Sequence, residues 1–217
     1  METKTFIVPH DFTQVAYNAL NHAIATAKPL KAEIFVIHVV SKEKNIKEAE
    51  EKLNKLISTL DPEVKLIPKV RVGNIFEDIG DFAAEHHAEL IFMGTHGTSG
   101  WQHITGSNAL KVVTNSNVPF IIVQEKAIKE SGYDDIVVPL DLNKETKQKL
   151  TIVANIATYF KSRVHVITPN ETDEFLKKKV QANILFANRF FSERGIEVTS
   201  KFASAGSFDK EVVKHAV

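Results

Sequence analysis

The chain of 217 residues contains no cysteine. This absence excludes disulfide bonds, thiolate catalysis and zinc sites built from cysteines. An excess of charge is also missing, because 27 Lys and Arg residues balance 27 Asp and Glu residues. Without a long-range positive field, we expect neither nucleic acid nor an anionic membrane as a partner.

Long hydrophobic runs are absent as well. No apolar stretch approaches the roughly 18 residues of a transmembrane helix. The N-terminus shows no basic segment followed by a long apolar core, so no signal peptide is expected. With 43% hydrophobic and 25% charged residues, the composition predicts an ordinary folded protein, which we expect to be soluble and cytoplasmic.

The first half of the chain alternates short apolar runs with segments of helical periodicity. Apolar residues repeat at helical spacing from 16 to 27, from 49 to 60 and from 75 to 82. Such alternation is typical of an α/β fold with an open, doubly wound parallel sheet. The expected strands, the third of which is interrupted by Pro68, are Phe6–Pro9, Ile34–Val40, Leu66–Val72, Leu90–Met93 and Phe120–Val123.

The opening segment recurs later in the chain. Asp135-Ile-Val-Val-Pro-Leu-Asp141 matches Phe6-Ile-Val-Pro-His-Asp11 at an offset of 130 residues, and a second pair of segments, at Lys31 and Lys161, has the same offset. We interpret this as a duplication, with one domain at 1–126 and a second at 133–217. The second copy is expected to be truncated, since about 40 residues of the repeat have no counterpart.

A glycine-rich loop follows the fourth strand and runs from Gly94 to Ser107. Glycines let backbone N–H groups approach an anion closely, and the N-terminus of the next helix adds further donors. The loop matches neither the Walker A motif nor the dinucleotide fingerprint. A simple connecting turn is the alternative interpretation.

Its position favours a binding site. Open α/β sheets bind ligands at the carboxyl ends of the strands, where the strand order reverses. If the order is 3-2-1-4-5, Asp11 after the first strand and Gly94 after the fourth flank one crevice.

Together these residues resemble the universal stress protein family, in the form that carries two copies in one chain. Ile7-Val-Pro-His-Asp11 is similar to the family's opening motif, and Ile37-His-Val-Val40 to its second strand. Met93-Gly-Thr-His-Gly97 with Gly106-Ser107 resembles its ATP loop, with one residue fewer between Gly97 and Gly106.

The resemblance implies an adenine nucleotide bound in the first domain: ATP, or alternatively ADP or AMP, with Mg²⁺ accompanying the nucleotide. Asp11, Pro9 and the Val39 backbone would lie near adenine, and Met93 would pack on the base or ribose. The ribose and phosphates would be surrounded by Gly94, His96, Gly97, Gly106, Ser107 and Asn108. For Asp141 in the second domain, a turn residue preceding a helix is the favoured interpretation.

Three functions stay open: a nucleotide-responsive stress protein without strong catalysis, an interaction module that has lost nucleotide binding, and a weak ATPase. The loop has no acidic residue between Gly94 and Asn117, so we expect no catalytic residues. The histidine spacing predicts no metal site, and the residue pattern disfavours a phospho-receiver domain. The family resemblance also implies an intrachain pseudo-dimer that pairs through the last strand of each unit, and a homodimer of whole chains is a further expectation.

Overall fold

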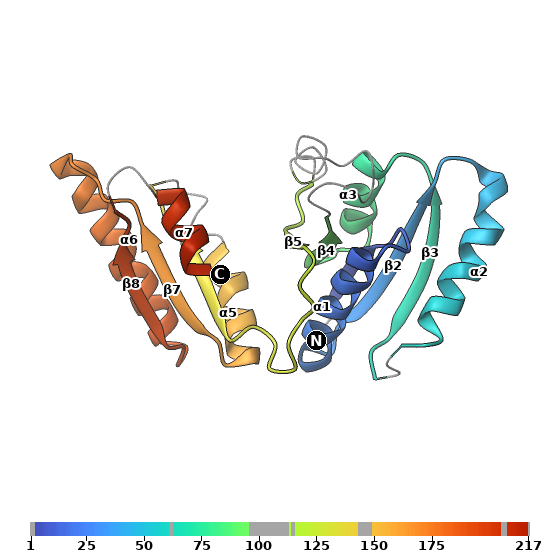
Figure 1. Cartoon of the computed structure of the whole chain (residues 1–217), viewed down its shortest axis with the longest axis horizontal. Coiled ribbons are helices and arrows are strands. Elements are labelled where there is room, and N and C mark those ends of the chain that lie inside the picture. Colours follow the sequence, from blue (N-terminus) through green and yellow to red (C-terminus); the bar gives the residue numbers. More distant parts are fainter. Residues whose placement is uncertain are drawn as a thin grey trace. The chain divides into compact units, whose positions relative to one another are not determined.

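The computed structural model describes residues 3–60, 63–95, 113, 116–142, 149–204 and 208–216. The chain divides into two compact units, Met1–Ile128 and Lys129–Val217, which we call unit 1 and unit 2 (Figure 1). Each unit is described by itself below. None of the helices in the described segments is both long and apolar enough to cross a membrane.

Within the described residues, unit 1 contains a parallel sheet of five strands in the order β3-β2-β1-β4-β5. This order confirms the expected doubly wound fold, with β1 in the centre. Each strand coincides with one of the apolar runs of the sequence. The bounds are β1 Thr5–Pro9, β2 Glu33–Val40, β3 Leu66–Val72, β4 Leu90–Gly94 and β5 Phe120–Val123.

Pro68 lies in β3, at the edge of this sheet. Proline lacks the N–H group that a central strand would donate on one of its two sides, so an edge position tolerates it best. The strand β3 therefore continues through Pro68, although this proline interrupts the apolar pattern of the sequence.

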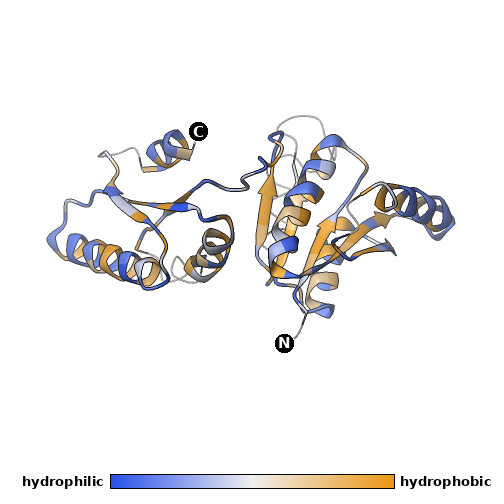
Figure 2. Cartoon of the chain, turned by 90° about the horizontal axis from the view of Figure 1, so that it is seen from below, coloured by the Kyte–Doolittle hydropathy of each residue, from blue (hydrophilic) through white to orange (hydrophobic). Residues whose placement is uncertain are grey.

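Helices cover both faces of the unit 1 sheet. Their bounds are α1 Gln14–Leu30, the short 3-10 helix η1 Glu43–Asn45, α2 Ile46–Ile57 and α3 Ile75–Glu85. On one face, α1 buries an alanine- and leucine-rich stripe that includes Ala16, Leu20 and Ala23. On the other, α3 buries Ile79 and Phe82 against Phe35, Ile37, Ile91 and Met93 of the sheet. The sheet is thus apolar on both sides, as Figure 2 shows by its colour.

Unit 2 repeats the first half of this arrangement. Its sheet has the order β6-β7-β8, which corresponds to β1, β2 and β3. This three-stranded sheet fits a partial second copy of the fold. The elements are β6 Asp135–Pro139, α5 Lys149–Phe160, β7 Arg163–Thr168, α6 Glu174–Ser192, β8 Val198–Phe202 and α7 Phe208–Ala216.

Only one face of the unit 2 sheet carries an extensive apolar core among the described residues. There α5 and α6 pack on the sheet around Leu140, Leu150 and Phe191. The helix α7, which ends at the C-terminus in Figure 2, lies on the opposite side of the sheet and has no buried residue.

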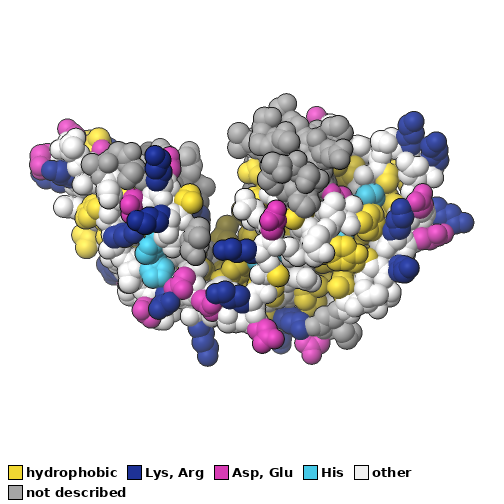
Figure 3. Space-filling model, in the orientation of Figure 1, with side chains coloured by type: hydrophobic (Ala, Val, Ile, Leu, Met, Phe, Trp, Pro, Cys, Tyr) yellow, Lys and Arg dark blue, Asp and Glu magenta, His cyan; other side chains and the backbone are white. Residues whose placement is uncertain are grey.

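Charged and polar side chains occupy that opposite side. Asp135 pairs with both Arg163 (2.9 Å) and His165 (2.9 Å), and the other ring nitrogen of His165 lies 2.7 Å from the hydroxyl of Thr199. The His165 ring meets the ring of His215 from α7 at 5.0 Å. Histidine, cationic and acidic side chains gather on this part of unit 2 in Figure 3.

Candidate functional site

In unit 1, β2 lies on one side of β1 and β4 on the other, so the strand order reverses between β1 and β4. β1 pairs with β2 through Pro9 and Ile37 at its carboxyl end, and with β4 through Ile7 and Ile91. Since all three strands are parallel, the residues that follow them emerge at one edge of the sheet. The topology therefore places the Asp11 turn between the ends of β2 and β4.

The Asp11 carboxylate organises the turn into α1. Its Oδ1 accepts hydrogen bonds from the backbone N–H of Thr13 (3.1 Å) and from the Thr13 hydroxyl (2.5 Å). Thr13 is the N-cap of α1, and its side chain accepts from the N–H of Ala16. One carboxylate oxygen is thus engaged in the turn, while no described residue is seen to bond Oδ2.

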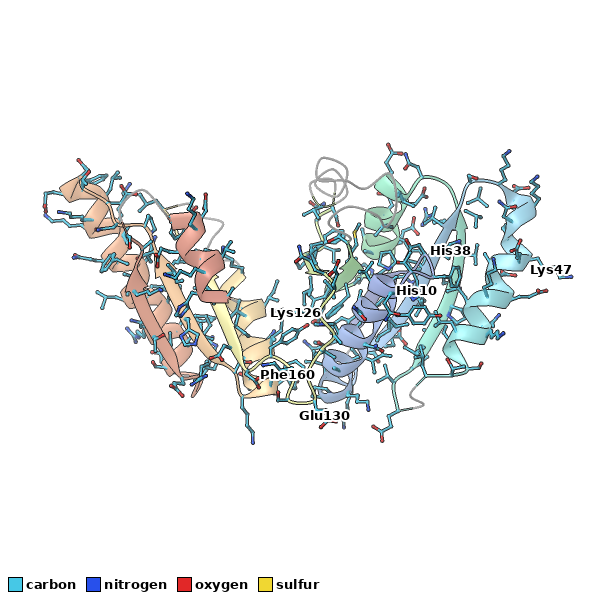
Figure 4. All side chains as sticks on the ribbon, viewed as in Figure 1. His10, His38, Lys47, Lys126, Glu130 and Phe160 are labelled. Carbon is cyan, nitrogen blue, oxygen red and sulfur yellow. The ribbon has the colours of Figure 1, made fainter. Side chains whose placement is uncertain are left out.

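The buried side chain of His10 stabilises the same turn through a hydrogen bond to its backbone. The residue is fully buried, and its Nδ1 accepts a hydrogen bond from the N–H of Phe12 (3.0 Å), which has a left-handed φ of 66°. Its carbonyl accepts from Nδ1 of His38 at 2.7 Å, and Figure 4 shows the two histidines close together beside α1 and β2.

Burial and the nearby His38 lower the pKa of His10 to about 4, so the imidazole is neutral at pH 7. Because Nδ1 accepts from Phe12, the ring proton is on Nε2. That atom is buried and has no hydrogen-bond partner in the described part of the chain. The imidazole ring of His10 meets the ring of Tyr17 edge to face, with 4.8 Å between the two ring centres. Sequence reasoning missed this residue, since nothing in the pattern distinguishes it from other polar residues after a strand.

Gly94 has a packing role in addition to its expected one. A Cβ built on Gly94 would lie 2.5 Å from the carbonyl oxygen of Val15 and 2.9 Å from the nitrogen of Ala16. Both atoms belong to the backbone of the first turn of α1, so they cannot rotate away. The glycine at the end of β4 therefore allows α1 to approach the sheet.

The remaining predicted site residues have different degrees of exposure. Pro9 is buried, and Val39 is half-buried. Met93 is 1% exposed and packs in the core with Ile91. Five predicted residues lie outside the described residues: His96, Gly97, Gly106, Ser107 and Asn108. The phosphate half of the expected site stays a prediction.

Metal-binding chemistry has no candidate in the part of the chain that the structure describes. No group of three or more His, Asp or Glu residues there is arranged to hold a metal ion. The Asp135 and His165 pair in unit 2 is already committed to Arg163 and Thr199.

Comparison with known proteins identifies the family. The profile of the Universal stress protein family matches residues 41–124. A universal stress protein of Methanocaldococcus jannaschii is 31% identical over 140 residues, which cover 56% of this chain and 82% of that protein. This chain belongs to the universal stress protein family.

A solved structure of a universal stress protein from Archaeoglobus fulgidus DSM 4304 shares its fold, with a TM-score of 0.75 and 18% identity, covering 99% of this chain and 83% of that one. Another from Archaeoglobus fulgidus, solved in complex with dAMP, has 24% identity and a TM-score of 0.46, and covers 56% of this chain and 98% of that one.

The corresponding turn of unit 2 in this universal stress protein is built differently. Leu140 takes the position of His10: its N–H donates to the Ile167 carbonyl at 2.9 Å, as that of His10 donates to Ile37 at 2.8 Å. Leu140 is 1% exposed and belongs to the apolar core. The carbonyl of Asp141 accepts from the Asn183 amide of α6. The two segments share this backbone hydrogen bond after the first strand, while the side chains at the two positions differ.

Proposed function

We propose that this universal stress protein binds an adenine nucleotide, ATP or a related ADP or AMP, at the switch point of unit 1. The observation that carries the proposal is the adjacency of Asp11 and Gly94 at the ends of neighbouring parallel strands. A glycine-rich segment follows Gly94 in the sequence, and such loops can hold phosphates through backbone N–H groups. In this arrangement Asp11 and the Val39 backbone contact adenine, with Pro9 and Met93 beneath it.

Binding without efficient turnover fits the residues around the proposed phosphate position. Hydrolysis needs a positioned general base and usually acidic residues that hold magnesium near the phosphates, whereas the segment between Gly94 and Asn117 contains no acidic residue. The protein would then act as a nucleotide-responsive component of the stress response, with magnesium arriving on the phosphates of the nucleotide.

Calorimetric titration of the full chain with ATP and magnesium tests this function. We expect saturable binding with one nucleotide per chain. Asp11→Asn keeps an oxygen that can accept from Thr13 but removes the charge, so it separates the turn from ligand recognition. We expect Asp11→Asn to weaken binding about tenfold, which corresponds to about 1.4 kcal/mol.

The matched control is Asp141→Asn in unit 2, for which we expect unchanged ATP affinity. Gly106→Asp tests the phosphate position, because a carboxylate beside the phosphates repels them and should reduce binding at least tenfold. If the wild-type chain takes up no ATP, ADP or AMP at millimolar concentration, the proposal is wrong. If Gly106→Asp binds ATP normally, the phosphates lie elsewhere.

A second proposal concerns the origin of the two units. We infer that they are copies of one ancestral domain, with approximate limits at 1–126 and 133–217. The pairing register supports this, because β1 pairs with β2 from Thr5 and Glu33 onward as β6 pairs with β7 from Asp135 and Arg163 onward, each at an offset of 130. Separate expression of residues 1–126 tests it: a folded, ATP-binding fragment is expected, and an unfolded one would contradict the division.

A further inference from the structure

The helix α6 of unit 2 exposes apolar side chains that its counterpart α2 in unit 1 does not. Both helices follow the second strand of their sheet and lead into the third. In α2 the exposed residues are charged, apart from Asn54, and the apolar residues Ala49, Leu53 and Leu56 are buried. In α6, by contrast, Phe175 is 64% exposed and Leu185 is 71% exposed.

These apolar residues lie on the side of α6 that faces away from its sheet. At 100° per residue, Phe175, Ala182 and Phe186 fall on one stripe, with Leu185 at its border. The side chains that pack on the sheet, Val180, Ala187 and Phe191, fall on the opposite stripe. The exposed residues are therefore additional to the face by which α6 joins its own core.

Cationic side chains are interleaved with the exposed apolar ones. Lys178, Lys179 and Arg189 are exposed on the same side of the helix, and Arg189 forms an ion pair with Glu193 at 2.7 Å. The ammonium group of Lys179 lies 4.4 Å from the centre of the Phe175 ring. The sequence of α6 contains four basic residues and one acidic residue, and both of its cap residues, Asp173 and Glu193, are acidic, whereas α2 contains three residues of each sign. The net charge of the whole chain is zero and therefore does not reveal this excess of basic residues in α6.

We propose that the outer face of α6, formed by Phe175, Lys178, Lys179, Leu185 and Arg189, binds an anionic lipid surface. Apolar side chains enter the boundary between headgroups and acyl chains, while long cationic side chains keep their charge at the headgroups. A bilayer deforms around a protruding helix, so this face does not require a partner with a complementary groove. Pairing of this face with a second copy is opposed by its own charge, because cations would meet cations.

Co-sedimentation of the full chain with vesicles tests the proposal. We expect binding to vesicles of phosphatidylcholine with phosphatidylglycerol, and at least tenfold weaker binding to phosphatidylcholine alone. Lys178→Glu with Lys179→Glu should lower the partition coefficient on anionic vesicles at least tenfold, since each surface cation contributes about fivefold. Leu185→Gln tests the apolar part and should lower it about threefold or more.

The matched control is Lys47→Glu with Lys55→Glu on α2, which makes the same change in total charge on an exposed helix. We expect this variant to lose less than half as much affinity, on a logarithmic scale, as the α6 variant. Circular dichroism and thermal unfolding check that every variant is folded.

The proposal is overturned if the wild-type chain does not bind anionic vesicles at low salt. It is also overturned if the α2 and α6 variants lose binding equally, since the effect would then come from total charge. Light scattering after gel filtration measures the molar mass of the wild-type chain and of the Leu185→Gln variant, and so detects a dimer. Loss of a dimer in the Leu185→Gln variant, without any loss of vesicle binding, would identify the α6 face as a protein interface instead.

Discussion

Units 1 and 2 fold their first three strands in the same order, yet they stabilise one face of the sheet by different means. At the position where unit 1 has Phe35, packed on Phe82 and His86 of the α3 region, unit 2 has His165, bonded to Asp135 and Thr199. A common backbone topology therefore accepts either an apolar or a polar contact beneath the crossover helix. The difference shows that topology alone does not determine how firmly that helix is held.

Burial of apolar surface and exposed ion pairs differ in how much they stabilise a fold. Full burial of a Phe or Leu side chain contributes about 1.5–3 kcal/mol, whereas an exposed ion pair contributes about 0–1 kcal/mol. The Arg163 and Asp135 side chains are 55% and 41% exposed, so their pair belongs to the weak class. We therefore expect α7 to open more readily than α3.

The largest expected effect is that of removing the matched side chains. Phe35→Ala should cost about 3–4 kcal/mol in unit 1, because it leaves a cavity beside Phe82. His165→Ala in unit 2 should cost about 1 kcal/mol or less. Hydrogen exchange of peptides from β2 and β7 reports the opening free energy of each unit separately. Equal costs at the two positions would contradict the distinction between the two faces.

The second effect is a pH dependence of unit 1 that arises at His10. His10 is neutral in the folded chain because its pKa is lowered from 6.5 to about 4, so between these values the unfolded chain binds more protons. Stability contributed by His10 is present above pH 6.5 and is lost as the pH falls toward 4, by about 3 kcal/mol in total.

His10→Leu supplies the control, because Leu140 occupies the same position in unit 2. Burial also lowers the pKa of His22 in unit 1, so this variant should reduce the slope of unit 1 stability between pH 6.5 and 4 without abolishing it. Hydrogen exchange of β1 peptides at several pH values measures the slope. An unchanged slope in His10→Leu would show that His10 is not the responsible group.

The smallest expected effect is the difference in stability lost when the N-cap side chain of α6 or of α2 is removed. Asp173 accepts from the N–H groups of Phe175 (3.0 Å) and Leu176 (2.9 Å), while Asn45 makes no side-chain cap bond. Asp173→Ala should therefore cost about 1 kcal/mol, and Asn45→Ala less than about 0.5 kcal/mol. Urea denaturation followed by hydrogen exchange of each helix compares them. A larger loss in Asn45→Ala would reverse this assignment.

Much of the fold could be predicted from the sequence, because parallel strands buried on both faces form continuous apolar runs. Those runs located the five strands of unit 1. In unit 2, Arg163 and His165 alternate with valines in β7, and this alternation predicts that one face of the strand is polar. The polar contact beneath α7 lies on that face.

The candidate site was predictable in part. Asp11 and Gly94 could be placed at neighbouring strand ends because the alternating pattern predicted an open parallel sheet, for which the order 3-2-1-4-5 was expected. The burial of His10 could not be predicted, since it depends on Phe12 and Tyr17, which approach only when α1 packs on the sheet. The packing role of Gly94 also depends on tertiary structure, because the atoms that exclude a Cβ belong to α1.

The central claim is that the Asp11 turn of unit 1, and not the Asp141 turn of unit 2, forms a nucleotide site. A crystal structure of the full chain grown with ATP and magnesium tests it most directly. We expect density for one nucleotide, with its adenine beside Asp11 and Val39 and its phosphates beyond Gly94. Density at Asp141 alone, or an empty crevice at Asp11 in crystals grown with millimolar ATP, would contradict the account.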